Sequence, residues 1–318
     1  MNIDEILDII FKSSRIAITF HVSPDGDSIG SALALTRGLK KLGKDVYIIC
    51  NEKAPVTFSY LNGVDEIDGN SNYVDRDTQC LIVLDCGDLT RVSAELNLKN
   101  RRYSIVNIDH HLSNSAFGDF NYVDSKASSV GEIIYLILKK LNIALDRQMG
   151  EDLYTSLICD TGGFKYTNTT PQTLIIASEL IKLKINFNNI YKIIYENKKF
   201  ERIKLYGKVI DKMYLAQDKK ICIMQLNREM AVDLGIEFGD TSDVIAIGMD
   251  IDTIEVGMLF KETEDGIKIS LRSKSIVDVS KIAQKFGGGG HIRASGLTLN
   301  LPLEEAIKVL EDAVKEQL

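Results

Sequence analysis

The sequence predicts an α/β protein: a mainly parallel N-terminal sheet with helices on both faces, and a smaller mixed α/β C-terminal domain across a cleft. Three observations carry this prediction. The first half of the chain alternates short, β-branched apolar runs with segments of helical periodicity. The apolar runs come closer together after about residue 208. A chain of 318 residues is also long enough for two domains.

The N-terminal domain, residues 1–187, is predicted from its strand and helix candidates. The strand candidates are Arg15–Phe20, Val46–Cys50, Leu81–Asp85 and Ser104–Ile108, and their near-continuous apolar character is typical of buried parallel strands. The helix candidates, with apolar residues three and four positions apart, are Ser28–Leu42, Gly131–Leu141 and Gln148–Cys159. A purely structural alternative for Asp25-Gly26 is a turn, with Ser28 as the cap of the first helix. Parallel sheets bind ligands beyond the carboxyl ends of their strands, so we expect the functional residues there.

A basic, helical stretch over residues 188–207 is predicted to connect this domain to residues 208–318. The strand candidates of the second domain are Ile221–Leu226, Val244–Met249, Thr253–Phe260, Ile267–Leu271 and Gly296–Leu299. Asp265-Gly266 predicts a hairpin turn, and a final helix is expected from Leu303 onwards.

The composition indicates a soluble, cytoplasmic protein. Its 45 acidic residues outnumber 38 lysines and arginines, so the chain as a whole should repel long nucleic acids. The longest uncharged apolar runs have only strand length, which argues against a membrane span. The first ten residues include no basic residue, which argues against a secretory signal. Five cysteines without a C-x-x-C pair suit reduced thiols.

Histidine and aspartate side chains follow three of the predicted strands and end one helix. The candidate metal ligands are His21, Asp25, Asp27, Asp85, His110 and Asp160, and Asp109 and His111 flank His110. A single aspartate after a strand is more often a helix cap or a turn residue. The coincidence of several such residues at one sheet edge instead favours a metal site.

The types of ligand indicate which metal this site would bind. Two imidazoles and four carboxylates without a thiolate suit Mn(II), admit Mg(II), Co(II) or Fe(II), and suit Zn(II) less well. Two divalent ions would neutralise four carboxylates, so we expect a two-metal site with Asp85 as the bridging ligand. Cys86 and Cys159 adjoin candidate ligands but are expected to be small buried residues.

A glycine run near the C-terminus is the candidate anion-binding element. Gly288, Gly289 and Gly290 lie in this run, His291 follows it, and Arg272, Lys274 and Arg293 are the nearby basic residues. Glycines let backbone N–H groups approach a phosphate closely, and the basic side chains would add charged hydrogen-bond donors. A flexible linker is the alternative, but an apolar run before the glycines and the predicted strand Gly296–Leu299 after them argue against it.

These motifs together resemble the DHH phosphoesterase family with a DHHA-type C-terminal domain. The resemblance rests on H-V-S-P-D-G-D-S-I-G at 21–30, L-I-V-L-D-C-G-D at 81–88, D-H-H at 109–111, C-D-T-G-G-F at 159–164 and G-G-G-G-H-I-R-A-S-G at 287–296. It implies a two-Mn(II) domain and a second domain that grips the substrate.

Carried over residue by residue, the resemblance implies a role for each candidate. His21 and Asp25 would bind one ion, Asp27, His110 and Asp160 the other, and Asp85 both. His111 would face the scissile phosphate, and Asp109 would orient a histidine. Arg272, His291 and the glycine run would bind substrate, with Arg91, Lys274 and Arg293 as further phosphate contacts.

The two-domain length resembles family members that degrade very short RNA and remove a phosphate from 3′-phosphoadenosine 5′-phosphate (pAp). Hydrolysis of cyclic-di-AMP or of its linear product pApA is the alternative within the family. A nucleotide sensor without turnover and a single-strand exonuclease are further alternatives, and a pyrophosphatase is set aside because its Ser-Arg-Lys motif is missing. We expect short RNA and small nucleotides as partners, no long duplex and no membrane, and we leave a homodimer open.

Overall fold

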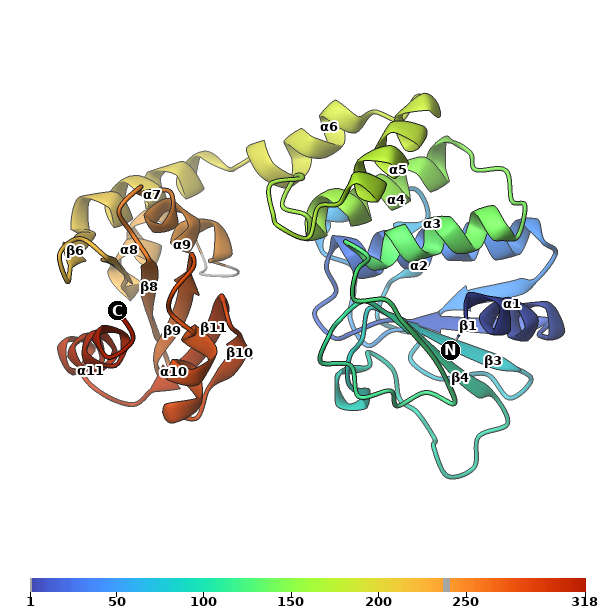
Figure 1. Cartoon of the computed structure of the whole chain (residues 1–318), viewed down its shortest axis with the longest axis horizontal. Coiled ribbons are helices and arrows are strands. Elements are labelled where there is room, and N and C mark those ends of the chain that lie inside the picture. Colours follow the sequence, from blue (N-terminus) through green and yellow to red (C-terminus); the bar gives the residue numbers. More distant parts are fainter. Residues whose placement is uncertain (1, 237–240) are drawn as a thin grey trace. The chain divides into compact units, whose positions relative to one another are not determined.

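The computed structural model describes residues 2–236 and 241–318, which form two units (Figure 1). Unit 1 is Met1–Asn197 and unit 2 is Lys198–Leu318. The boundary falls within residues 188–207, the stretch that the sequence predicts as a connector. Each unit has its own sheet and its own buried hydrophobic core.

The described part of unit 1 contains a five-stranded sheet in the order β2-β1-β3-β4-β5. Its strands are β1 (Arg15–Thr19), β2 (Asp45–Ile48), β3 (Cys80–Leu84), β4 (Ser104–Asp109) and β5 (Phe120–Val123). Its helices are α1 (Ile3–Lys12), α2 (Gly26–Lys41), α3 (Val130–Lys140), α4 (Arg147–Asp160), α5 (Pro171–Lys182) and α6 (Phe187–Tyr191). Short 3₁₀ turns lie at Val56–Phe58, Val64–Glu66 and Leu89–Arg91, and a π-helical turn at Lys192–Glu196.

The predicted parallel sheet is confirmed, because every neighbouring pair of strands in unit 1 runs parallel. Ile16 of β1 pairs with Cys80 of β3, and Ile82 pairs with Val106 of β4, so the carboxyl ends of these strands share one edge. The sequence did not predict β5. This edge strand is short and mostly half-buried, which weakens its apolar signal.

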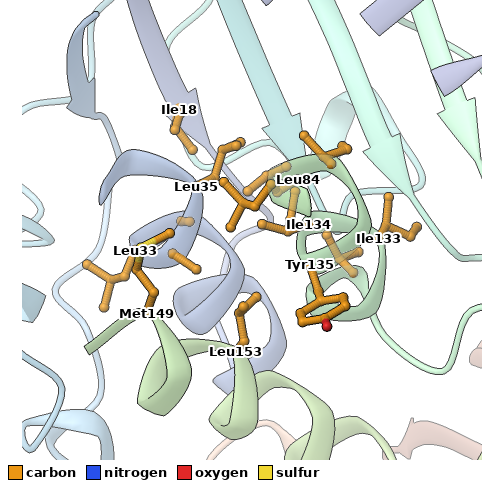
Figure 2. Packing of buried hydrophobic residues seen from close by; sticks show 14 of the residues in the cluster. Ile18, Leu33, Leu35, Leu84, Ile133, Ile134, Tyr135, Met149 and Leu153 are labelled. Carbon is orange, nitrogen blue, oxygen red and sulfur yellow. The ribbon is translucent and has the colours of Figure 1, made fainter. Parts of the chain in front are cut away.

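One face of this sheet packs on helices and forms the larger core of unit 1. Figure 2 shows Ile18 of β1 and Leu84 of β3 near Leu35 of α2 and Ile134 of α3. These side chains recur every second residue in the strands and at helical spacing in the helices, as burial of one face of each element requires. This packing holds the strands in position, so that the residues directly after them lie at the carboxyl edge of the sheet.

The opposite face of the sheet packs on irregular segments, where the sequence predicts helices. Leu81 and Val83 of β3 and Ile105 of β4 cluster there with Val92 and Tyr103. The connections around β3 supply these contacts, and their apolar residues recur without a helical period. Scattered apolar side chains therefore cover this face in place of amphipathic helices.

Helix α2 begins two residues earlier than predicted, and its cap is Asp25 rather than Ser28. Oδ1 of Asp25 accepts hydrogen bonds from the backbone N–H groups of Asp27 and Ser28, at 3.0 and 3.1 Å. The Ser28 hydroxyl in turn accepts the N–H of Asp25 at 3.0 Å. Both residues thus belong to one capping box, in which the Asp25 carboxylate caps the helix.

The first turn of α2 lies directly against α4. A Cβ atom on Gly26 would come 2.2 Å from Sγ of Cys159, and one on Gly30 would come 2.3 Å from the carbonyl oxygen of Asp152. Only glycine permits such an approach. The contact brings the start of α2 close to Asp160, the last residue of α4.

The described part of unit 2 contains a six-stranded sheet in the order β10-β11-β9-β8-β7-β6, with β7 and β8 parallel and the other neighbours antiparallel. Its strands are β6 (Tyr214–Ala216), β7 (Ile221–Leu226), β8 (Val256–Thr263), β9 (Gly266–Ser273), β10 (Gly289–His291) and β11 (Ala294–Leu299). Its helices are α7 (Phe200–Lys212), α8 (Arg228–Leu234), α9 (Ser242–Met249), α10 (Val279–Lys285) and α11 (Leu303–Lys315). Across residues 2–236 and 241–318, no helix combines the length and the apolar character needed to cross a membrane.

The predicted strand Val244–Met249 is wrong, because these residues belong to helix α9. Val244 and Ile245 are buried against β7 and β8, and Gly248 allows a close approach to Met224. Burial at 244, 245 and 248 follows a helical period, not the alternation of a strand. A short apolar run does not distinguish the two by itself, and the packing against the sheet selects the helix.

Candidate active site

His21 lies just beyond β1 and presents one ring nitrogen to the carboxyl edge of the sheet. Its Nδ1–H donates to the carbonyl oxygen of Val22 at 2.8 Å, which leaves Nε2 as the acceptor nitrogen. Nε2 lies 3.4 Å from Oδ2 of Asp85 and 3.8 Å from Oδ1 of Asp25. An imidazole whose other nitrogen is held in this way is oriented as a metal ligand.

Asp27 lies in the first turn of α2 and is almost fully buried. Its Oδ1 accepts hydrogen bonds from the hydroxyls of Ser31 and Ser156, at 3.1 and 2.5 Å. The backbone N–H groups of Val130 and Gly131, at the start of α3, donate to its two oxygens at 2.8 and 3.1 Å. Residues from three helices therefore hold this carboxylate in place, and only the carboxylate itself was predicted from the sequence.

Asp85 follows the last residue of β3 and has a left-handed backbone with φ of +53°. Aspartate tolerates this conformation better than most residues, and such strain is typical of functional sites. The side chain is 3% exposed. In the part of the chain that the structure describes, its buried Oδ1 has no hydrogen-bond partner. A buried carboxylate oxygen left without a donor fits a residue that binds a cation.

His110 points into the same cluster from the end of β4. Its Nδ1–H donates to the carbonyl oxygen of Ala127 at 3.2 Å, so Nε2 is again the acceptor. Nε2 lies 3.5 Å from Oδ2 of Asp160 and 3.8 Å from both Oδ2 of Asp27 and Oδ1 of Asp85. One imidazole nitrogen thus faces three carboxylates.

The structure brings the six candidate ligands into two adjoining groups. The ligand atoms within each group lie within 4.8 Å of one another, and the groups are His21, Asp25 and Asp85, and Asp27, His110 and Asp160. Asp85 contacts both groups, because its Oδ2 faces His21 and its Oδ1 faces His110. The donors are all imidazole nitrogens and carboxylate oxygens, so this set fits two divalent cations of the Mn(II) type.

The electrostatics of the cluster also favour bound cations. Burial, followed by the charge of Asp27, raises the pKa of Asp85 to about 8. The same two causes raise the pKa of Asp160 to about 7. Carboxyls crowded in this way hold protons near neutral pH unless cations replace the protons.

Asp109 and His111 form a pair beside the cluster. Nδ1–H of His111 donates to Oδ1 of Asp109 at 2.7 Å, and this hydrogen bond raises the pKa of His111 to about 9. Asp109 is fully buried, whereas the His111 side chain is 33% exposed. Burial opposes ionisation of Asp109, but the hydrogen bond and charge of His111, together with the hydrogen bonds from Asn114 and the backbone of His110, outweigh burial and lower the pKa of Asp109. His111 is therefore a cationic, accessible donor next to the candidate metal ligands.

Arg91, the remaining candidate in unit 1, is exposed at the end of a 3₁₀ turn, and its carbonyl oxygen accepts the N–H of Val22 at 2.7 Å. Val92, the next residue, bridges to His21. The backbone at Arg91 is thus attached to the segment that carries His21.

In unit 2, Arg272 and His291 lie in one register row of the sheet. Arg272 of β9 pairs with Ala294 of β11, which pairs in turn with His291 of β10. Residues in one row point to the same face, and two strand spacings separate them by roughly 10 Å. The small, half-buried Ala294 lies between them.

Lys274 and Arg293 donate to oxygens of their own unit. Nζ of Lys274 donates to the carbonyl oxygen of Ile251 at 2.6 Å. The guanidinium of Arg293 donates to the carbonyl oxygens of Val277, at 2.9 Å, and of Ser275. Both side chains thus hold backbone segments together, a role that the sequence analysis did not predict.

The glycine run leads into the short strand β10, which begins at Gly289, and is not a linker. A Cβ atom on Gly288 would come 2.3 Å from the carbonyl oxygen of Gly296, and Gly290 has φ of +140°, so the fold requires both glycines. Gly289 differs, because a Cβ atom there would have none of the described atoms within 4 Å. Its position in the strand admits a side chain, so the glycine leaves open space at the surface.

Family models account for most of the chain. The model of the DHH family, N-terminal domain, matches residues 15–159, and the DHHA1 domain model matches residues 218–317. A parallel sheet with imidazoles and carboxylates gathered at its carboxyl edge, followed by this second domain, defines a phosphoesterase. The chain belongs to the DHH family and carries a DHHA1 domain.

Its relatives have similar lengths. It is 29% identical over 310 residues to the bifunctional oligoribonuclease and PAP phosphatase NrnA of Thermus thermophilus, covering 95% of this chain and 90% of the relative. It is 30% identical to a probable enzyme of the same name from Streptococcus mutans, covering 92% and 91%. The crystal structure of an exopolyphosphatase-related protein from Bacteroides fragilis matches with a TM-score of 0.91 and 28% identity, covering 99% and 95%.

Proposed function

We propose that this protein is a two-metal phosphohydrolase that cleaves short oligoribonucleotides and removes the 3′-phosphate of pAp to give AMP. The observation that carries the proposal is Asp85, whose two buried oxygens face the two adjoining ligand groups. Relatives that are similar along nearly the whole chain are named as oligoribonucleases and PAP phosphatases, which supports the choice of substrates.

Two Mn(II) ions are the proposed cofactors, held by His21, Asp25 and Asp85 and by Asp27, His110, Asp160 and Asp85. When bound, the ions would supply a water of lowered pKa and neutralise charge on the phosphoryl oxygens. Imidazole and carboxylate donors without a thiolate support Mn(II) over Zn(II).

His111 is the proposed catalytic residue, and Asp109 holds it. Because Nδ1–H is engaged by Asp109, the exposed part of the ring offers Nε2–H to a phosphoryl oxygen or to the leaving group. The raised pKa of His111 keeps the ring protonated at neutral pH, as a donor of this kind requires.

Unit 2 is the proposed substrate-binding domain. The shared register row of Arg272 and His291, together with the open space at Gly289, supports binding of a terminal phosphate there. The proposed additional phosphate contacts are Arg91, Lys274 and Arg293. Lys274 and Arg293 already donate to backbone carbonyl oxygens, so they would bind phosphate through their remaining N–H groups.

A single terminal phosphate site favours short substrates over long ones. The net charge of −7 also works against a long polyanion. Hydrolysis of pApA or cyclic-di-AMP is the second candidate, since both offer the same arrangement of nucleoside and phosphate. We further propose a cytoplasmic enzyme, as its free cysteines favour.

The deciding experiment compares pAp, pApA, cyclic-di-AMP, ribonucleotides of two to five residues and a 24-residue RNA. Purified protein is assayed with Mn(II), with Mg(II) and with EDTA, and products are separated by chromatography. We expect Mn(II)-dependent release of AMP from pAp and of mononucleotides from the shortest RNAs. Preference for cyclic-di-AMP or for the 24-residue RNA would overturn the proposed substrate class.

A further inference from the structure

Two asparagines outside the predicted set lie behind the Asp109–His111 pair. Nδ2 of Asn114 donates to Oδ2 of Asp109 at 2.6 Å and to Oδ1 of Asn107 at 2.8 Å. Asn107 is fully buried in β4, although the strand around it is apolar. These contacts form an amide–carboxylate chain that runs from Asn107 through Asn114 and Asp109 to His111.

The hydrogen bonds determine which way each amide faces. Nδ2 of Asn107 donates to the carbonyl oxygens of Val83 and Cys86, at 3.3 and 3.1 Å, so its Oδ1 faces Asn114. Asn114 then presents its NH₂ group to that oxygen, and its own Oδ1 accepts the N–H of Ala116 at 2.7 Å. Backbone groups at both ends thus fix the NH₂ of Asn114 towards Asp109.

Asp109 is consequently held at both carboxylate oxygens. Oδ1 accepts Nδ1–H of His111 at 2.7 Å and the backbone N–H of His110 at 2.8 Å, while Oδ2 accepts from Asn114. A carboxylate with only one oxygen held can rotate about its terminal bond, and the imidazole bonded to it would move with it. Asn114 removes this freedom.

We propose that Asn114 is a positioning residue, which acts on the reaction through Asp109 by fixing the direction of the His111 ring. This inference rests on the proposed role of His111 in the hydrolysis. Among the described residues, the Asn114 side chain is hydrogen-bonded to Asp109, Asn107 and the backbone of Cys86 and Ala116, and to none of the six candidate metal ligands. Its effect should therefore appear in the catalytic step and not in metal binding.

A double-mutant cycle tests this assignment. We expect Asn114→Ala to lower kcat about 10- to 100-fold, with KM and the Mn(II) content per chain unchanged. In a His111→Ala background, the same substitution should lower the residual kcat by less than about twofold, because the residue through which it acts is already missing. Equal losses in both backgrounds would show that Asn114 acts independently of His111 and would overturn the proposal.

Asn121 provides a matched control. It also lies after the histidines, and its amide is hydrogen-bonded at 2.9 and 2.8 Å to the backbone of Gly118, without contact to Asp109. Asn121→Ala should therefore show no coupling to His111→Ala. Asn121 lies in β5, and its bonds to Gly118 hold the end of the loop between β4 and β5 that carries Asn114. Coupling of the same size at Asn121 would indicate that general loosening of this loop explains both effects, which contradicts the specific role of Asn114.

A second variant and a second substrate keep the outcomes distinct. Asn114→Ser retains one hydroxyl donor and should keep more of kcat than Asn114→Ala. If both variants fail to fold or lose bound metal, Asn114 supports the fold or the ligands, and the proposal is wrong. All variants are also assayed on bis(p-nitrophenyl) phosphate. If the wild type cleaves this diester but not pAp or diribonucleotides, the proposed substrates fail while the cycle still tests Asn114.

Discussion

Asp85 shows most directly how one residue connects backbone conformation to chemistry. Its left-handed backbone ends β3 while its N–H still donates to the carbonyl oxygen of Ile108 at 3.0 Å. The side chain is thereby buried among groups that do not satisfy both of its oxygens. Such an arrangement is unfavourable for folding by itself, and it is one that a bound cation would complete.

Substituting Asp85 tests the bridging role. We expect Asp85→Asn to fold, because asparagine tolerates the left-handed backbone, and to lower kcat by about 10³-fold or more through loss of metal-supplied stabilisation of the transition state. Added Mn(II) should raise the thermal midpoint of the wild type but hardly that of the variant. Asp88→Asn, at an exposed carboxylate of the same loop, should keep the Mn(II)-induced shift. A variant that retains the shift and the turnover would refute the bridge.

Gly289 is a residue whose lack of a side chain the fold does not require. We expect Gly289→Ala to leave the stability unchanged and to raise KM about fivefold to tenfold, through loss of about 1 kcal/mol of phosphate binding. Steady-state kinetics with pAp provide the measurement. Gly207→Ala is the matched control, because that glycine also has open space around its absent Cβ but lies inside α7. It should stabilise the helix slightly and leave KM unchanged. An unchanged KM at Gly289→Ala would place the phosphate elsewhere.

At the scale of elements, the segment after β9 is held from two sides. Oε1 of Glu255 accepts the backbone N–H groups of Ser275 at 2.9 Å, of Ile276, and of Val277 at 3.0 Å. Arg293 donates to the carbonyl oxygens of the same segment. Burial opposes ionisation of Glu255, but the backbone hydrogen bonds outweigh burial and lower its pKa.

The lowered pKa of Glu255 predicts the pH dependence of stability. A carboxyl whose pKa falls on folding stabilises the fold above its unfolded pKa of about 4.5, and this contribution is lost as the pH falls through the lower, folded value. We expect Glu255→Gln to lower the free energy of unfolding of unit 2 by about 1–3 kcal/mol at pH 7 and by less near pH 3. Urea titrations at both pH values measure this difference. Glu264→Gln, in the exposed β8–β9 turn, should have little effect, and a pH-independent loss at Glu255 would contradict the ionic explanation.

At the scale of the whole molecule, the two units have separate cores. Among residues 2–236 and 241–318, each cluster of buried hydrophobic residues lies entirely within one unit. All six candidate metal ligands belong to unit 1. We therefore expect metal binding to stabilise unit 1 and to leave the stability of unit 2 largely unchanged.

Scanning calorimetry tests this independence. In EDTA we expect two unfolding transitions, one for each unit. Saturating Mn(II) should raise the midpoint of one transition only, because a ligand stabilises the unit that binds it, by about 2.7 kcal/mol at 100 times Kd. Isolated Asp85→Asn protein should lack this shift and serves as the control. A single transition that moves as a whole would show that the units unfold together.

Much of the fold and of the cluster of candidate metal ligands follows from local sequence. Apolar runs at strand length predicted β1, β3 and β4, and their common direction predicted that Asp85, His110 and the residues after β1 would meet. The apolar run Val244–Met249 is short enough to fit either a helix or a strand, so its sequence did not predict α9. Strand β5 is short and only partly apolar, so its sequence did not predict a strand. A polar residue in an apolar strand, Asn107, was a signal that could have been read as functional.

The sequence by itself determined which chemical groups this protein carries and the sheet edge to which they belong, because strand and helix periods and the direction of parallel strands are local properties. The tertiary structure alone decided that Oδ1 of Asp85 has no hydrogen-bond partner among the described residues, that Asn114 holds Asp109, and that Arg293 binds the backbone of Ser275 and Val277. Each of these depends on atoms from separate segments coming within about 3 Å, and such distances are set by packing and not by sequence spacing.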